Sequence, residues 1–101
     1  MGRGSIPPRR LSVSWVYRVE ESALHELRDL GPSVAAEIFA YLDTRISGSS
    51  DPRQFGKPLR GPLKGFWRYR VRDYRILCRL EDGIVTVVVV SVGHRSRVYG
   101  D

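Results

Sequence analysis

The sequence of 101 residues contains one cysteine, Cys78. A single thiol excludes an internal disulfide framework and a cysteine-based zinc cluster, and it fits a reducing compartment better than secretion. The longest apolar run, residues 84–92, is interrupted by Thr86 and Ser91 and is far shorter than the ~20 residues of a membrane-spanning helix. The N-terminus shows no apolar signal-peptide segment either. We therefore expect a soluble, cytoplasmic protein that does not bind membranes.

The sequence also lacks the motifs of several enzyme classes. It has neither a G-x-S-x-G nucleophile elbow nor a glycine-rich loop of the kind that cradles phosphates. Its two histidines, His25 and His94, lie far apart in the chain and offer no metal-ligand spacing. Cys78 lies between Leu77 and Arg79 in an expected strand, which is typical of a small core residue. These absences argue against a serine or cysteine hydrolase and predict neither a metal site nor a cofactor.

Positive charge is concentrated in one segment. The chain has 17 Lys and Arg against 11 Asp and Glu, a net charge of +6. Residues 1–46 contain as many acidic as basic residues, whereas residues 57–75 contain seven basic residues and one acidic residue, Asp73. Nearly all the basic residues are arginines, whose planar guanidinium binds phosphate through two hydrogen bonds and stacks on bases. With aromatic residues interleaved, this segment favours nucleic-acid binding over a basic face that only aids solubility.

The hydrophobic pattern predicts one small domain. Residues 1–13, rich in Gly, Pro, Ser and Arg, are expected to be a flexible tail, and residues 14–101 a single domain. Gly31 ends one helix, and Pro32 suits the first position of the next. Proline and glycine punctuate residues 48–63, which predicts a loop. The expected elements are a strand at 13–19, helices at about 20–30 and 32–47, and strands at 66–72, 74–80 and 84–92.

These elements predict an α+β fold of order β-α-α-β-β-β, with a curved, mainly antiparallel four-stranded sheet and a two-helix hairpin on one face. Asp82-Gly83 is a hairpin signal. The last strand is apolar at nearly every position, so we expect it to be central and covered on both faces. The side-chain period of two places Arg68, Arg70 and Arg72 on the face away from the helices, with Arg75 beside them. Few acids lie nearby in sequence, which favours an anionic ligand there.

Several short motifs, in this order and on these elements, resemble the RelE toxins of the RelE/ParE superfamily. They are KPLRG at residues 57–61, WRYRVRDYRI at 67–76, and VGHR at 92–95 followed by Val98 and Tyr99. The resemblance covers about residues 14–99. It implies the toxin of a type II toxin–antitoxin system: a metal-independent endoribonuclease that cleaves mRNA in the ribosomal A site, with the RNA's own 2′-hydroxyl as nucleophile.

The resemblance also implies catalytic roles. Arg68 and Arg70 match positions that carry catalytic lysines in the best-known members, and Arg75 matches a phosphate-binding arginine. Arg95 matches an arginine that acts on the transition state or leaving group, and Tyr99 matches a tyrosine that orients or stacks the nucleotide. Further RNA contacts are expected from other basic residues: Lys57, Arg60, Lys64, Arg72 and Arg97.

The two arginines in place of lysines change the proton chemistry. Arginine, with a pKa above about 12, does not give up its proton, so Arg70 is a poor general base. We expect His94, or Tyr99 with a pKa lowered by the surrounding arginines, to take that role while Arg70 stabilises charge.

The resemblance implies three partners: a cognate antitoxin, the ribosome with its mRNA, and operator DNA reached through the antitoxin. An acidic, amphipathic antitoxin segment that folds on binding would suit the basic and apolar surface. Two alternatives stay open. One is a ParE-like inhibitor of DNA gyrase, and the other is a non-catalytic RNA- or ribosome-binding module, for which arginine and stacking aromatics suffice. Arg75, Arg95 and Tyr99 together favour the nuclease.

Overall fold

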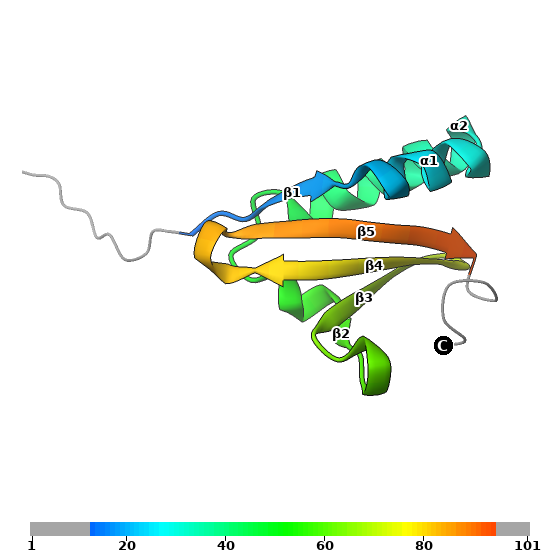
Figure 1. Ribbon diagram of the computed structural model, residues 1–101. Helices are drawn as coiled ribbons and strands as arrows, with labels where there is room; N and C mark the ends of the chain where they lie inside the picture. The colour runs from blue at the N-terminus through cyan, green and yellow to red at the C-terminus, as the bar shows by residue number, and fades with distance from the viewer. Residues whose placement is uncertain (1–12, 95–101) are drawn as a thin grey trace, which may run out of the picture.

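The computed structural model describes residues 13–94 and shows a five-stranded mixed sheet with two helices packed against one face (Figure 1). The strand order is β1-β5-β4-β3-β2. β1 runs parallel to β5, and the other neighbouring strands are antiparallel. The elements are β1 (Val16–Val19), α1 (Glu21–Leu30), α2 (Pro32–Tyr41), β2 (Lys57–Pro58), β3 (Phe66–Val71), β4 (Tyr74–Glu81) and β5 (Thr86–His94).

The helical hairpin confirms the sequence prediction. Gly31 has a φ of 98°, a left-handed value that glycine adopts without strain, and its N–H donates to the carbonyl of Arg28. Pro32 then starts α2 with its fixed φ. A π-helical turn, Leu42–Ile46, extends the second helix close to its expected end. None of the helices within residues 13–94 is long and apolar enough to cross a membrane.

The core lies between the hairpin and the sheet. β5 lies between β1 and β4, and most of its residues are buried, as its apolar sequence predicted. Cys78 is fully buried, which raises the pKa of its thiol, so the expectation of a core cysteine is confirmed. The helices contribute Ala23, Leu27, Ile38, Leu42 and Ile46 to the core, and the sheet contributes Tyr69, Ile76, Cys78, Val87, Val89 and Val92.

The expected four-stranded sheet is wrong by one strand. Within the predicted loop, Lys57 pairs with Arg68 and Pro58 with Trp67, which adds β2 at the edge of the sheet. Proline has no N–H to donate and is tolerated on an edge strand. A two-residue strand that contains proline has no periodicity of its own, so the sequence pattern showed only a loop.

The turn before β5 also differs from the expected hairpin. Asp82–Ile84 form a 3₁₀ turn, and Val85 follows in the left-handed region with a φ of 47°. β5 therefore begins at Thr86, two residues later than expected, and Ile84 is 60% exposed. The pairing of β4 with β5 also contains a register shift. Leu77 pairs with Ser91, whereas Cys78 pairs with Val89.

The outer edge of β5 is covered by α1 where β1 ends. The N–H of Glu20 donates to the carbonyl of Val89 at 2.9 Å. Farther along, the Glu26 carboxylate accepts hydrogen bonds from Val92 N at 2.8 Å and Ser91 Oγ at 3.1 Å. These contacts satisfy backbone groups that would otherwise leave β5 open to pairing with another chain.

Tyr17 makes stability depend on alkaline pH. Burial and the hydrogen bond from its hydroxyl to Asp43 Oδ1, at 2.6 Å, raise the pKa of Tyr17 from 10 to about 12. A neutral Tyr17 therefore favours the folded state fully below pH ~10, and this contribution is lost as the pH rises towards 12. We expect Tyr17→Phe to be less stable than wild type by about 1 kcal/mol at pH 8. The difference should shrink above pH 10 in urea unfolding curves, and a difference independent of pH would contradict this account.

Candidate functional site

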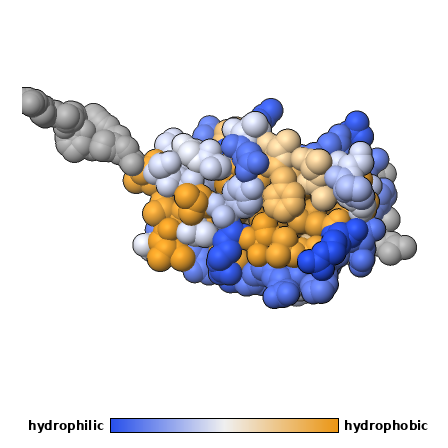
Figure 2. Space-filling view, turned by 90° about the horizontal axis from the view of Figure 1, so that it is seen from above, coloured by the Kyte–Doolittle hydropathy of each residue, from blue (hydrophilic) through white to orange (hydrophobic). Residues whose placement is uncertain are grey.

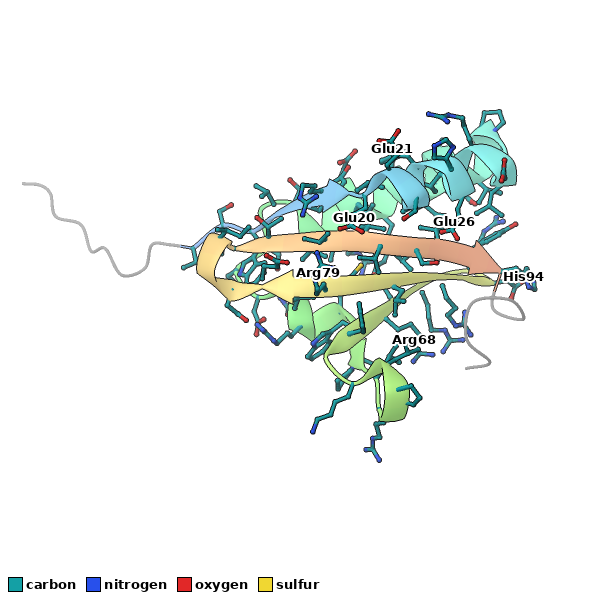
Figure 3. The ribbon with its side chains drawn as sticks, in the orientation of Figure 1. Glu20, Glu21, Glu26, Arg68, Arg79 and His94 are labelled. Carbon is teal, nitrogen blue, oxygen red and sulfur yellow. The ribbon has the colours of Figure 1, made fainter. Side chains whose placement is uncertain are left out.

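β3 and β4 place three arginines on the sheet face turned away from the helices. Arg70 pairs with Arg75 and Arg68 with Leu77, and residues that pair across antiparallel strands lie on the same face. The prediction that Arg68, Arg70 and Arg75 share a face is thus confirmed. Arg68 and Arg75 are only 8% and 4% exposed, whereas Arg70 is exposed. Figure 3 shows Arg68 near β3, beyond β5 and β4 from Glu21 and Glu26 of α1.

Two like-charged pairs lie side by side in this sheet. Lys57 is opposite Arg68 across β2 and β3, and Arg70 is opposite Arg75 across β3 and β4. The Cβ atoms of such pairs are about 5 Å apart, and like charges placed directly opposite each other are destabilising. We call these four residues the basic cluster. Strand pairing thus concentrates positive charge in this part of the sheet.

A pocket of about 250 Å³ adjoins the basic cluster at the β2–β3 edge of the sheet. Three cluster residues, Lys57, Arg68 and Arg70, line one side of it. The other wall consists of Gln54 and Phe55, from the 3₁₀ turn Pro52–Phe55, and Gly56. Sequence analysis missed this wall, because only the pairing of β2 with β3 brings it beside the arginines.

Tyr69 holds the wall against the core. Its buried hydroxyl donates to the carbonyl of Pro52 at 2.8 Å. A Cβ added at Gly56 would lie 2.9 Å from the Tyr69 ring and 3.0 Å from the Arg68 carbonyl, so only glycine allows the backbone to approach this closely. Burial raises the pKa of Tyr69, which keeps the hydroxyl protonated as a donor.

Arg53 anchors the same turn from the other side. Its guanidinium donates to both carboxylate oxygens of Asp82, at 2.9 and 2.7 Å, and lies 5.8 Å from the ring centroid of Trp15 and 5.7 Å from that of Trp67. Its backbone N–H donates to Asp51 Oδ1 at 3.1 Å. The hydrogen bond from Arg53 holds the pKa of Asp82 below its usual value. The pocket wall is therefore fixed to the 82–84 turn by an ion pair in which one guanidinium nitrogen, Nη2, donates to both oxygens of Asp82.

At the other end of β4, carboxylates neutralise the positive charge. Arg79 Nε lies 2.9 Å from Glu81 Oε2, and Arg79 Nη2 lies 3.4 Å from Glu20 Oε2. By contrast, Arg70 forms no ion pair within residues 13–94. Within these residues, positive charge in the sheet is therefore neutralised at Arg79 and not at Arg70.

Arg72 does not join the basic cluster, contrary to the sequence prediction. Val71 pairs with Tyr74, so Arg72 and Asp73 form a two-residue hairpin turn, and Arg72 adopts a φ of 56°. Its Nε lies 3.2 Å from Oε2 of Glu37 on α2. The turn interrupts the strand alternation and directs Arg72 towards the helices.

His94 also lies away from the basic cluster. It pairs with Tyr74, which packs against the core, and the two rings meet edge to face with their centroids 5.8 Å apart. His94 lines a separate cavity of about 610 Å³ with Glu26 and Asp29 of α1, and Figure 3 shows it at the end of β5. His94 and Arg70 lie on opposite faces of the sheet, so the structure does not bring these two predicted site residues together.

The remaining candidates are placed differently. Arg60 and Lys64 flank the 3₁₀ turn Gly61–Leu63 between β2 and β3; both are exposed, and neither lines the pocket. The predicted site residues Arg95, Arg97 and Tyr99 lie outside the described residues. Within residues 13–94, no group of three or more His, Cys, Asp or Glu side chains is arranged to hold a metal ion.

The helix side of the molecule has a different chemistry. Figure 2 shows hydrophobic surface between hydrophilic side chains on this side. An apolar groove of about 300 Å³ crosses the hairpin, lined mainly by Leu24, Leu27, Ala35 and Phe39, with Arg28 at its margin. The sheet separates this groove from the basic cluster.

Comparison with known proteins gives consistent results. The family model described as the ParE toxin of the type II toxin–antitoxin system parDE matches residues 17–99. Toxin RelG of Mycobacterium tuberculosis is 36% identical over 87 residues, which cover 84% of this chain and 95% of RelG.

Solved structures with this fold include two toxin–antitoxin complexes. The RelBE2 complex of Mycobacterium tuberculosis has a chain that matches with a TM-score of 0.74 and 34% identity, over 82% of this chain and 100% of that one. The intact RelBE complex of E. coli matches with a TM-score of 0.55 and 28% identity, over 79% and 95% of the two chains. The chain therefore belongs to the RelE/ParE family of toxins from type II toxin–antitoxin systems.

Proposed function

We propose that this toxin is an endoribonuclease that cleaves mRNA in the ribosomal A site. The main support for the proposal is that four basic residues lie together beside a pocket. Lys57 is opposite Arg68, and Arg70 is opposite Arg75. A protein–protein inhibitor needs no such concentration of phosphate-binding groups, whereas a nuclease needs one at the scissile phosphate.

In the proposed reaction, the 2′-oxygen of the RNA attacks the neighbouring phosphorus. The bond from phosphorus to the 5′-oxygen breaks, which leaves a 2′,3′-cyclic phosphate and a 5′-hydroxyl. Negative charge grows on the non-bridging oxygens in the transition state, and arginines already in position stabilise it without reorganisation. The exposed Arg70 and the buried Arg75 opposite it are assigned to this role.

A base must take the proton of the 2′-hydroxyl, and an acid must give one to the 5′-oxygen. Arg68 and Arg70 do not deprotonate and so cannot be the base. His94 loses its geometric support, because it lies on the opposite face of the sheet from Arg70. Tyr99 remains as the proposed base. Arg95 is proposed to stabilise the charge on the leaving 5′-oxygen, which then takes its proton from water. Both Tyr99 and Arg95 lie outside the described residues.

A cognate antitoxin is the proposed partner that controls this activity. The similar chains in the RelBE2 and RelBE structures are components of toxin–antitoxin complexes. An acidic antitoxin segment would neutralise the basic cluster and so compete with RNA for it. Through the antitoxin, the complex would also reach operator DNA.

An inhibitor of DNA gyrase is the second candidate function, because the matching family model describes the ParE toxin. The first experiment is therefore primer extension on an mRNA that is translated in a purified system in the presence of the toxin. The control is the same mRNA incubated with the toxin but without ribosomes. We expect cuts within A-site codons that require both the toxin and the ribosome.

Two other results would support a different function. An intact message with inhibited gyrase would support the ParE-like function. Inhibited translation of an uncut message, together with tight ribosome binding, would support a non-catalytic binding module. Either result would contradict the nuclease.

A further inference from the structure

The wall of the basic pocket carries groups that the proposed phosphate chemistry does not use. Gln54 is exposed and offers both a hydrogen-bond donor and an acceptor from its carboxamide. Phe55 is half-buried: its ring packs against the core, has its centroid 5.8 Å from the guanidinium carbon of Arg45, and lines the pocket. A phosphate site alone needs cations and N–H donors. A carboxamide and an aromatic ring side by side are instead the groups that proteins use to recognise the bases of single-stranded RNA.

Gln54 and Phe55 lie close to the residues that are proposed to bind the scissile phosphate. Gln54 and Phe55 line the same pocket as Arg68 and Arg70, whose guanidinium groups are assigned to the RNA backbone. The pocket beside the arginines has a volume of about 250 Å³. A nucleotide held by its phosphate at Arg70 therefore has space for its base beside Gln54.

The wall is rigid enough to select a base. The hydroxyl of Tyr69 fixes the Pro52 carbonyl, Arg53 ties the turn to Asp82, and the close approach at Gly56 permits no side chain. Because the backbone of the wall is fixed, the ordering cost of binding is limited to the Gln54 side chain itself. The Gln54 side chain itself makes no hydrogen bond within residues 13–94, so its carboxamide is available to a ligand.

We propose that Gln54 and Phe55 form a base-binding subsite that determines which nucleotide flanks the cleaved bond. Phe55 stacks on the base, and the Gln54 carboxamide pairs with its hydrogen-bonding edge. Adenine is the best match, because glutamine forms two hydrogen bonds with it, one donated and one accepted. This inference rests on the proposed nuclease function and adds a sequence preference to it.

The test compares cleavage positions on an mRNA that presents all codons to the ribosome in the purified translation system. Wild type is expected to prefer adenine at one position next to the cut by at least about fivefold, the lower end of what one bidentate contact contributes. Gln54→Ala should lose most of that preference, measured as the fraction of all cuts that lie beside adenine. Gln54→Glu should shift the preference towards cytosine, because a carboxylate accepts from the amino group of that base.

Ser50→Ala is the matched control, because Ser50 is exposed, precedes the same turn and does not line the pocket. It should keep the wild-type preference. If wild type cuts RNA and Gln54→Ala retains the same preference, the subsite is refuted and the nuclease proposal stands. If wild type cuts no RNA, both are refuted. Circular dichroism of each variant ensures that only folded proteins are compared.

Discussion

Arg70→Ala is expected to reduce mRNA cleavage by about 10²- to 10³-fold, the usual effect of removing one preorganised group that stabilises transition-state charge. Arg70 is exposed and lies opposite Arg75 in the basic cluster. Because it makes no ion pair within residues 13–94 and faces another arginine, its loss should change the free energy of unfolding by less than about 0.5 kcal/mol. Primer extension gives the cleavage rate, and urea unfolding gives the stability.

Arg72→Ala is the control for this prediction. It removes the same kind of side chain two residues later, from a position where Arg72 pairs with Glu37 on the helix side. Both partners are substantially exposed, so the ion pair contributes at most about 1 kcal/mol to stability. Cleavage should stay within about threefold of wild type. Equal losses in the two variants would mean that net charge, and not the position of Arg70, governs activity.

The sequence predicts those parts of the fold that depend on strong local signals. Gly31 and Pro32 mark the helical hairpin because one permits a positive φ and the other starts a helix. The alternation from Trp67 to Arg70 predicts the face of the arginines because it lies within a single regular strand.

The sequence does not predict the positions of Arg72 and His94, because a turn or a register shift changes which face of the sheet a side chain lies on. Arg72 leaves the ladder because the hairpin has only two turn residues. The run of valines in β5 is apolar at each position, so it gives no alternation from which the face of His94 can be determined. The register shift opposite Leu77 and Cys78 adds a further change that no sequence pattern marks.

The wall of the pocket was missed for a related reason. Gln54 and Phe55 have no motif of their own, and a loop rich in proline and glycine gives no period to extrapolate. Their place beside Arg68 depends on the two-residue pairing of β2 and on the contacts of Tyr69. For this site, the sequence therefore predicts the residues on the strand, Arg68 and Arg70, but not the loop residues beside them.

Tyr69→Ala is expected to destabilise the domain by about 3 to 5 kcal/mol, the usual cost of removing a buried aromatic side chain. Tyr69 is fully buried, and its ring packs at 6.3 Å, centroid to centroid, from that of Tyr41. It also contacts Gly56 and fixes the Pro52 carbonyl, so the cavity would open beneath the pocket wall. The melting temperature should fall by on the order of 20 °C in a thermal scan followed by circular dichroism.

Tyr69→Phe separates the two contributions of this side chain. The ring remains, and only the hydrogen bond to the Pro52 carbonyl is lost, which should cost about 1 to 2 kcal/mol because that acceptor loses its donor. The phenylalanine variant should therefore melt between wild type and the alanine variant. Equal melting temperatures for the two variants would assign the whole effect to the hydroxyl and contradict the packing argument. A wild-type melting temperature for Tyr69→Phe would instead show that the wall is held by packing alone, in which case Gly56 and Arg53 would have to fix the position of Gln54 without help from the hydroxyl.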